Sequence, residues 1–500
     1  MPYKLFSYER RLGIRELESL GVTTLVDEVD SIVGIGDPVV AERLTYFGSV
    51  LGVDGEEPTE QAAVELGHLQ TRAAPGRQAT RYGLHGIHEY KGKFNPQIVR
   101  ALCNVVDPEA ETLIDPFCGS GTALVEGLRL GMDVVGIDQS PIASLIAKAK
   151  LGATTAKSAG ALADDLLSLA DRTAEAMAAA QAGTGDGHQV TDLGPEAEEY
   201  LRRWFTPPAY RGLIAALAIL NREEKTPSGQ LGRVALSSIL RQVSLQLPED
   251  LRIRRRPEPF TAPLMAPLFL ESIERIRRGL LEIGSWQEIT SSWTLRHGSA
   301  EELDAYAAAR GGKRRLILTS PPYATALPYI DTDRLSVVAL GLAGSGELNA
   351  VERSLIGSRE WARPQQHEWD ERRKENSDRL PPEVVALTTD IEERNEESGA
   401  GFRRQAVPSL LYRYFARMGT ALDRWRAVLE EGESAVLIVG HNHTNAGGER
   451  VEIPTPLLLA EIAAERGFVV RETIKLETWP RYGLHAANGV PGEDAVVLER

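Results

Sequence analysis

The sequence has few of the residues that build secreted, membrane or metal-bound scaffolds. Its 500 residues include only two cysteines, Cys103 and Cys118, which excludes a disulfide framework and a zinc site of four cysteines. No apolar run approaches the ~20 residues that span a bilayer, and the first residues lack the order of a signal peptide. These absences predict a cytoplasmic protein with no membrane partner and no metal.

Positive charge is also scarce. The chain has 56 Lys and Arg against 71 Asp and Glu, a net charge of −15, although proteins that bind nucleic acid need cations for the phosphates. Net charge does not decide the charge of one face, however. The arginines concentrate in two clusters, Arg252, Arg254, Arg255 and Arg256, and then Arg275, Arg277 and Arg278. Each cluster is either a phosphate-binding surface or a solvated helix face.

The remaining composition is that of an ordinary soluble protein, with 42% hydrophobic and 25% charged residues. A chain of this length can bury a large core, as one large domain with insertions or as two domains.

The first stretch with a chemical signal is Leu113–Thr122, which reads Leu-Ile-Asp-Pro-Phe-Cys-Gly-Ser-Gly-Thr. An apolar strand ends in Asp115, and a glycine-rich turn leads into a helix. Such a turn places backbone N–H groups beside a ligand, and Gly119 and Gly121 allow the close approach. The Asp115 carboxylate would repel a pyrophosphate. The turn therefore favours a nucleoside or amino-acid-like ligand that carries an amine.

Two further strands are expected to end in functional side chains. Asp133–Asp138 is a short strand that ends in an acid, at about the distance where a ribose-binding carboxylate stands in nucleotide folds. Asp138 has two compatible interpretations, this ligand and the cap of the helix that follows, and its position after a glycine-containing strand favours the ligand. Arg315–Tyr323 is a buried strand that runs into Ser320-Pro321-Pro322-Tyr323, a tetrad that by itself also fits a simple turn.

Together these motifs resemble the S-adenosylmethionine-dependent DNA methyltransferases that act on exocyclic amino groups, the N4-cytosine and N6-adenine types. The stretch from Asp115 to Thr122 resembles their cofactor motif, and Ser320–Tyr323 resembles their catalytic motif. The resemblance implies an α/β fold with a Rossmann-like, seven-stranded sheet, S-adenosylmethionine as cofactor and DNA as partner. Separate restriction or defence proteins are further expected partners, since the chain shows no convincing nuclease motif.

The resemblance also implies which residues form the site. The segment His85–Val99 resembles one that precedes the cofactor motif and helps to hold the methionine end of the cofactor; a plain loop and helix cap is the alternative. The implied cofactor residues are Lys93, Phe94, Asp115, Pro116, Phe117, Gly119, Ser120, Gly121, Thr122, Asp138 and Gln139. Candidate nucleic-acid contacts are Arg252, Arg254, Arg255, Arg256 and Tyr329.

The catalytic motif suits the chemistry. The lone pair of a base amine is conjugated into the ring, so an enzyme helps by accepting hydrogen bonds from the amine N–H groups. The Ser320 hydroxyl and the Pro321 carbonyl supply acceptors, and proline fixes the direction of its carbonyl without adding a donor. Tyr323 offers a π-face to a base turned out of the stack. No metal and no protein nucleophile are required.

The first residue of the motif bears on the choice of base. In the resembling family, serine there is usual for cytosine N4 enzymes, whereas aspartate or asparagine is usual for adenine N6. Ser320 therefore favours cytosine N4. The cofactor motif precedes the catalytic motif here, an order uncommon for cytosine enzymes, which keeps adenine N6 open. An RNA base-amine methyltransferase would share both motifs, and a non-catalytic binder would have lost Asp115, Ser320 or Tyr323.

Four parts of the chain are expected. Residues 1–80 form an N-terminal extension with a helix over Pro38–Leu51 and a loop over Gly55–Thr59. Residues 81–154 form the cofactor half of the core, and residues 155–291 a helical insertion that is a candidate for target recognition. Residues 292–500 form the catalytic half, interrupted by a polar insertion at about 344–401 and closed by an antiparallel strand pair.

Overall fold

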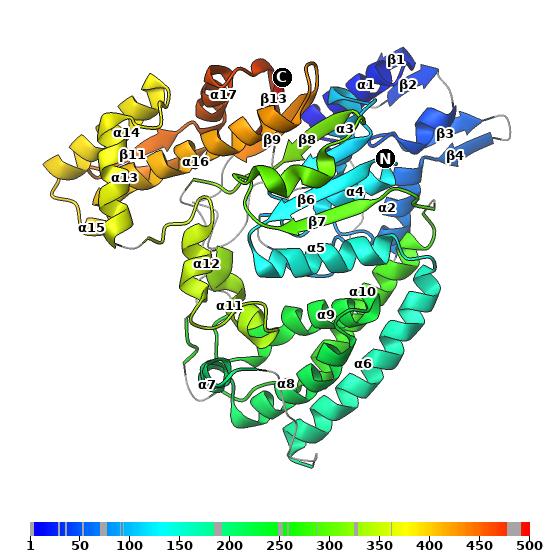
Figure 1. Ribbon diagram of the computed structural model, residues 1–500. Helices are drawn as coiled ribbons and strands as arrows, with labels where there is room; N and C mark the ends of the chain where they lie inside the picture. The colour runs from blue at the N-terminus through cyan, green and yellow to red at the C-terminus, as the bar shows by residue number, and fades with distance from the viewer. Residues whose placement is uncertain are drawn as a thin grey trace.

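The computed structural model describes residues 5–28, 31–35, 38–52, 55–70, 78–90, 92–93, 95–184, 193–248, 254–257, 260–286, 288–324, 329–361, 363–477 and 492–500. Within these ranges the chain forms a mixed α/β structure built around one large sheet, with a body of helices beside it (Figure 1).

The large sheet has seven strands in the described part of the chain, in the order β12-β13-β9-β8-β5-β6-β7. Their bounds are β5 (Thr112–Asp115), β6 (Asp133–Asp138), β7 (Trp293–His297), β8 (Arg315–Thr319), β9 (Ser434–Gly440), β12 (Val469–Glu477) and β13 (Gly492–Glu499). Strands β7, β6, β5, β8 and β9 run parallel, while β13 is antiparallel to both β9 and β12. The predicted seven-stranded sheet and its closing antiparallel pair are confirmed.

Both faces of the sheet are covered, which explains why its inner strands read as continuous apolar runs. Side chains alternate between the faces along each strand. In β9, Val436 and Ile438 belong to one apolar cluster, and Leu437 and Val439 to the other. The first cluster includes residues of α1 (Ser7–Ser19), α3 (Pro96–Val106) and α4 (Thr122–Arg129). The second includes η3 (Leu303–Ala309), α16 (Val407–Val428) and α17 (Thr455–Glu465).

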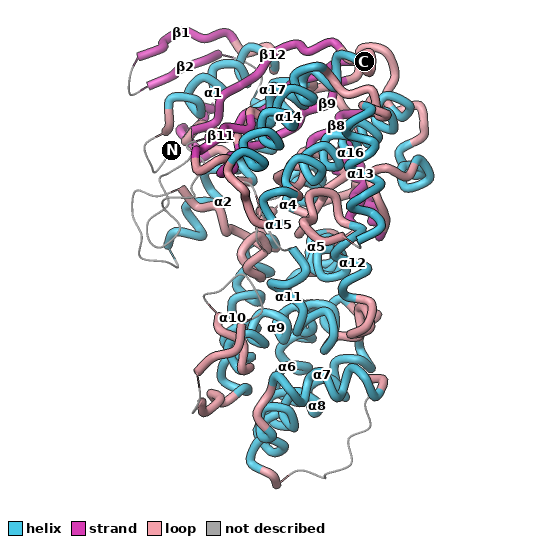
Figure 2. The backbone as a smooth tube through the Cα atoms, turned by 90° about the vertical axis from the view of Figure 1, so that its left-hand side faces the viewer, coloured by secondary structure: helices cyan, strands magenta, loops and turns pink. Residues whose placement is uncertain are grey.

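A separate body of helices lies on one side of the sheet, as Figures 1 and 2 both show. Its helices are α6 (Ala159–Ala182), α7 (Pro195–Trp204), α8 (Pro207–Leu220), η2 (Asn221–Glu223), α9 (Pro227–Val243) and α10 (Met265–Ile283). Helix α5 (Pro141–Thr154) packs between this body and the sheet, because Ile142 and Ile146 join the apolar core of the body. The stretch predicted as an insertion is helical here; the boundaries of the four parts stay predictions.

The catalytic half also contributes to this body and adds polar helices of its own. Helix α11 (Tyr329–Ala339) packs against α5, α7 and α9, and α12 (Leu348–Ser354) follows it. The charged segment continues in α13 (Arg363–Glu375), α14 (Pro382–Glu397) and α15 (Phe402–Gln405), and a hairpin of β10 (Asn442–Ala446) and β11 (Glu449–Ile453) lies after β9. None of the described helices combines the length and apolar character needed to cross a bilayer.

The N-terminal segment differs from the prediction. Besides α1 it contains β1 (Thr23–Glu28), β2 (Ser31–Ile35), η1 (Pro38–Glu42), β3 (Ser49–Gly52), β4 (Gly55–Pro58) and α2 (Glu60–Gln70). The prediction of a helix over Pro38–Leu51 is wrong, because only the short 3-10 helix η1 forms there. The prediction of a loop over Gly55–Thr59 is also wrong, because strand β4 forms there and pairs with β3. All four residues of β4 are exposed. Such a strand has no apolar alternation that would identify it from sequence.

Candidate active site

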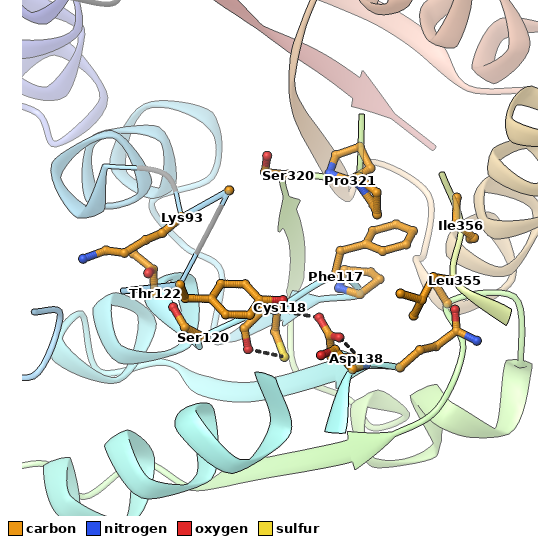
Figure 3. A pocket seen from close by; sticks show the side chains of 18 of the residues that line it. Lys93, Phe117, Cys118, Ser120, Thr122, Asp138, Ser320, Pro321, Leu355 and Ile356 are labelled. Carbon is orange, nitrogen blue, oxygen red and sulfur yellow. Dashed lines mark hydrogen bonds between the residues drawn. The ribbon is translucent and has the colours of Figure 1, made fainter. Parts of the chain in front are cut away.

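The three functional motifs meet at the carboxyl edge of the sheet, where β5, β6 and β8 lie side by side. An open cavity lies there (Figure 3), with about 880 Å³ of empty space that includes open solvent. It is lined by Pro116, Phe117, Gly119, Ser120 and Thr122 of the glycine-rich turn, by Asp138 at the end of β6 and Gln139 after it, and by all four residues Ser320, Pro321, Pro322 and Tyr323. In Figure 3, Ser320 and Pro321 lie across the cavity from Asp138.

The glycine-rich turn adopts a conformation that favours glycine. Gly119 has a φ of 50° and Gly121, the N-cap of α4, a φ of 77°; both lie in the left-handed region. A Cβ on Gly119 would also stand 3.0 Å from a ring carbon of Tyr90, and one on Gly121 would stand 3.1 Å from the Ala147 Cβ. The two glycines therefore let the turn pack closely against Tyr90, which lines the cavity, and against Ala147 of α5.

Gly119→Ala is expected to weaken cofactor binding and to cost about 1–2 kcal/mol of folding free energy, because alanine is strained at positive φ. Gly131→Ala is the matched control. Gly131 has a φ of 79° with no atom within 4 Å of a built Cβ, so it carries the same strain away from the cavity. Calorimetric titration with cofactor and thermal unfolding should show that both variants lose stability but only Gly119→Ala loses affinity. Equal affinity in the two variants would contradict a role for the turn.

Asp138 lies at the floor of the cavity. Its carboxylate accepts hydrogen bonds from the Gly119 N–H at 2.8 Å and the Ser140 N–H at 2.7 Å. Burial raises the pKa of Asp138, and these two hydrogen bonds act in the opposite direction. The cap of α5 is Ser140, whose hydroxyl accepts from the Ala143 N–H. The interpretation of Asp138 as the helix cap is therefore wrong, whereas its place in the cavity suits a ligand for ribose hydroxyls.

Asp115 is fully buried beneath the cavity rather than lining it. Its Oδ1 accepts from the Thr319 hydroxyl at 2.6 Å and from the Phe117 N–H at 3.2 Å. Thr319 directly precedes Ser320, so this carboxylate joins the glycine-rich turn to the catalytic strand. Among the described residues Oδ2 has no hydrogen-bond partner, and burial raises the pKa of Asp115 to about 7. A buried acceptor without a donor costs free energy, so this atom suits a ligand that brings an amine.

The segment before α3 contributes less directly than predicted. Tyr90, Gly92 and Lys93 line the cavity, but the Lys93 ammonium donates to the carbonyls of Thr80 at 3.1 Å and His85 at 2.6 Å. Figure 3 shows its amine turned away from the cavity. Burial lowers the pKa of Lys93 well below its usual range. Phe94 lies outside the described residues, so its predicted contact stays a prediction.

Sequence reasoning missed several lining residues, among them Leu355 and Ile356. They follow α12 in the polar segment and carry no motif. Arg413 of α16 holds this segment in place, because its guanidinium donates to the carbonyls of Ser358 and Glu360. Cys118, Ser140, Gly298 and Ala300 also line the cavity. Cys118 and Ser140 are next in sequence to predicted site residues. That adjacency is the one sequence signal that could have identified them.

Three of the candidate nucleic-acid residues do not line the cavity. Arg252 is outside the described residues, and Arg254, Arg255 and Arg256 do not line the cavity. Arg256 donates to the backbone carbonyls of Arg241, Gln242 and Gln246, so it holds its own loop. Tyr329 is the first residue of α11. Their contact with nucleic acid stays a prediction.

The second arginine cluster lies on α10, where Arg275 pairs with Glu271, and both Arg277 and Arg278 pair with Glu274. Pairs between neighbouring turns of one helix are typical of a solvated face. The described residues contain no cluster of His, Cys, Asp or Glu suited to a metal ion.

Comparison with known proteins finds matches to parts of the chain. Residues 87–188 match the UPF0020 family model, described as an RMKL-like methyltransferase domain. Type II methyltransferase M.MjaII of Methanocaldococcus jannaschii is 37% identical over 123 residues, 25% of this chain and 22% of that protein. Type II methyltransferase M.MvaI of Kocuria varians is 40% identical over 88 residues, 17% of this chain and 18% of that protein. The chain thus matches less than a quarter of either relative.

A solved structure, the rRNA methyltransferase aviRa from Streptomyces viridochromogenes, aligns over 83% of this chain and 88% of its own, at 11% identity and a TM-score of 0.29. That superposition is too loose to bear on the activity.

The cavity fits the cofactor of such enzymes, S-adenosylmethionine. Asp138 offers a carboxylate to ribose hydroxyls and the turn brings its backbone close, while beneath the cavity the Oδ2 of Asp115 has no donor among the described residues. Residues 87–188 are therefore similar to a methyltransferase domain, and part of this chain is similar to two type II methyltransferases.

Proposed function

We propose that this protein transfers a methyl group from S-adenosylmethionine to an exocyclic amine of a DNA base, with cytosine N4 as the favoured position. The observation that carries the proposal is the shared cavity: the cofactor turn and all four residues of Ser320–Tyr323 line one space. Both curated relatives are named type II methyltransferases, which supports DNA as the substrate.

The residues divide the work of the reaction. The bound cofactor supplies an electrophilic methyl group on a sulfonium, so the protein needs no nucleophile of its own. The glycine-rich turn, Asp115 and Asp138 hold the cofactor. The Ser320 hydroxyl and the Pro321 carbonyl accept hydrogen bonds from the base amine and so favour a nitrogen with an available lone pair. The remaining rate enhancement comes from positioning the two reactants and excluding water.

In a duplex the bases are paired and stacked, so the target base must leave the stack before it can enter the cavity. Tyr323 is half-buried at the cavity wall, where its ring can receive an extruded base. Base–aromatic stacking contributes roughly 1–3 kcal/mol, which offsets part of the cost of unstacking.

Adenine N6 is the second candidate for the target atom. It is favoured by the order of the motifs, since the cofactor turn at residues 115–122 precedes Ser320–Tyr323 in the chain. Ser320, in contrast, favours cytosine N4. An RNA base amine is the third alternative, which shares the same two motifs.

Methyl-labelled S-adenosylmethionine, incubated with unmodified DNA and separately with RNA, distinguishes these substrates. After digestion to nucleosides, we expect label in N4-methylcytosine from DNA. Label in N6-methyladenine would transfer the assignment to adenine, and label in RNA alone would overturn DNA as substrate. Absence of label in every nucleoside, with cofactor bound, would contradict methyl transfer to a base.

A further inference from the structure

The hydroxyl of Tyr323 is held by a residue outside the cavity. It donates a hydrogen bond to the carboxylate of Glu493, which is 170 positions later in the chain and does not line the cavity. Glu493 lies near the start of β13, opposite Gly440 at the end of β9. A hydrogen bond from a hydroxyl to a carboxylate is among the stronger kinds in proteins.

Two other contacts support the same part of the motif. The side-chain amide of Asn442, two residues beyond β9, donates to the carbonyl of Ala324, next to Tyr323. A Cβ on Gly357 would stand 2.9 Å from the Tyr323 carbonyl oxygen, and Gly357 has a positive φ, which favours glycine there. The backbone around Tyr323 thus contacts two other segments, and the Glu493 contact holds the far end of its side chain.

Holding that far end matters for stacking. Rotation about the first side-chain bond of a tyrosine moves its hydroxyl oxygen, so the hydrogen bond to Glu493 restricts that rotation directly. The oxygen lies on the axis of the second rotation, which the bond restricts through the preference of a phenol O–H for the plane of its ring. A ring that is already oriented loses less conformational entropy when a base stacks on it. If the base is misplaced by about 1 Å relative to the methyl group, the rate of methyl transfer can fall about 10²-fold. The carboxylate also engages the Tyr323 hydroxyl as a donor, which leaves the π-face as the part of the side chain offered to the base.

We propose that Glu493 is a positioning residue, which orients the ring of Tyr323 for the extruded base through this hydrogen bond. The proposal rests on the proposed function of base-amine methylation. The proposal gives strand β13, in the antiparallel part of the sheet, a role in the site. None of the sequence motifs lies on that strand.

The test is a double-mutant cycle on DNA methylation. Tyr323→Phe keeps the ring and removes the hydroxyl, and Glu493→Ala removes the acceptor. Each variant should lower kcat/KM for DNA by about tenfold to a hundredfold, with an unchanged dissociation constant for cofactor. The double variant should be no worse than the more impaired single variant, because both changes break one bond.

Two controls separate positioning from folding. Glu493→Gln keeps an oxygen that accepts from the tyrosine hydroxyl, so it should retain most of the activity lost in Glu493→Ala. Glu499→Ala removes a carboxylate from the other end of β13, where it pairs with Arg471 on the surface, and should leave activity on DNA unchanged. Because Tyr323→Phe leaves β13 intact, it tests the bond even where Glu493→Ala unfolds the strand.

Additive losses in the double variant, or a loss of cofactor affinity equal to the loss on DNA, would overturn the positioning role. If the wild-type protein transfers no methyl group to DNA, the proposed function itself fails, and the positioning role fails with it. An active wild type with additive variants overturns the positioning role alone.

Discussion

Replacing Ser320 by alanine is expected to lower methyl transfer to DNA by about 10²-fold or more, the loss found when one preorganised hydrogen-bonding group leaves an active site. Cofactor binding should stay close to the wild-type value, because Ser320 lies across the cavity from Asp138. Tyr323→Ala should also abolish efficient transfer, through loss of the stacking surface. Single-turnover rates with labelled cofactor and calorimetric titration with cofactor measure the two properties separately.

A control for the loss of a serine hydroxyl is Ser238→Ala. Ser238 lies in α9 of the helical body, where its hydroxyl contacts that of Ser272 at 2.8 Å, away from the cavity. This variant should methylate DNA at the wild-type rate. If Ser320→Ala and Tyr323→Ala lost cofactor binding as completely as they lost methyl transfer, the assignment of these residues to the base and of the glycine-rich turn to the cofactor would be contradicted.

Asp115→Asn is expected to weaken cofactor binding and to remove most of its pH dependence. Burial raises the pKa of Asp115 to about 7 in the cofactor-free protein, and a cationic amine binds the ionised form. Affinity for S-adenosylmethionine should therefore rise about tenfold per pH unit up to about pH 7 and then level off. Asparagine keeps an acceptor for Thr319 and for the Phe117 N–H, so the fold should be retained. Titrations at pH 5.5, 6.5 and 7.5 test this.

The same carboxyl affects stability with a definite sign. Its pKa is higher in the folded chain than the ordinary value of about 3.9, so the folded state binds the proton more tightly than the unfolded state. Its contribution to stability therefore falls as the pH rises from about 4 to 7, and bound cofactor should oppose that fall. The control is Asp107→Asn, which breaks a pair with Arg314 away from the cavity. A pH-independent affinity in the wild type, or an unchanged slope in Asp115→Asn, would contradict the role of Asp115.

The sequence predicts the centre of the fold because local signals and the tertiary structure agree there. The apolar runs that end at Asp115, Asp138 and Ser320 are neighbouring parallel strands. Since the carboxyl ends of such strands meet at one edge, the motifs had to converge. Local signals also mark the start of α3, where the Asn95 side chain accepts from the Gln97 N–H and Pro96 occupies the first turn.

The remainder of the site depends on contacts that no local pattern records. Leu355 and Ile356 reach the cavity because Arg413 of a distant helix holds their segment. Glu493 reaches Tyr323 because β13 lies beside β9, which is a property of sheet order. The Lys93 amine donates to the carbonyls of Thr80 and His85. This orientation depends on which groups surround the buried side chain, and the sequence pattern does not record them.

A crystal structure with S-adenosylhomocysteine, the product form of the cofactor, tests the central claim most directly. The account predicts density in the cavity between residues 116–122 and Ser320–Tyr323, with the ribose at Asp138 and the sulfur facing the serine motif. Density at another place on the molecule, or a sulfur that faces away from Ser320 with protein between them, would contradict it.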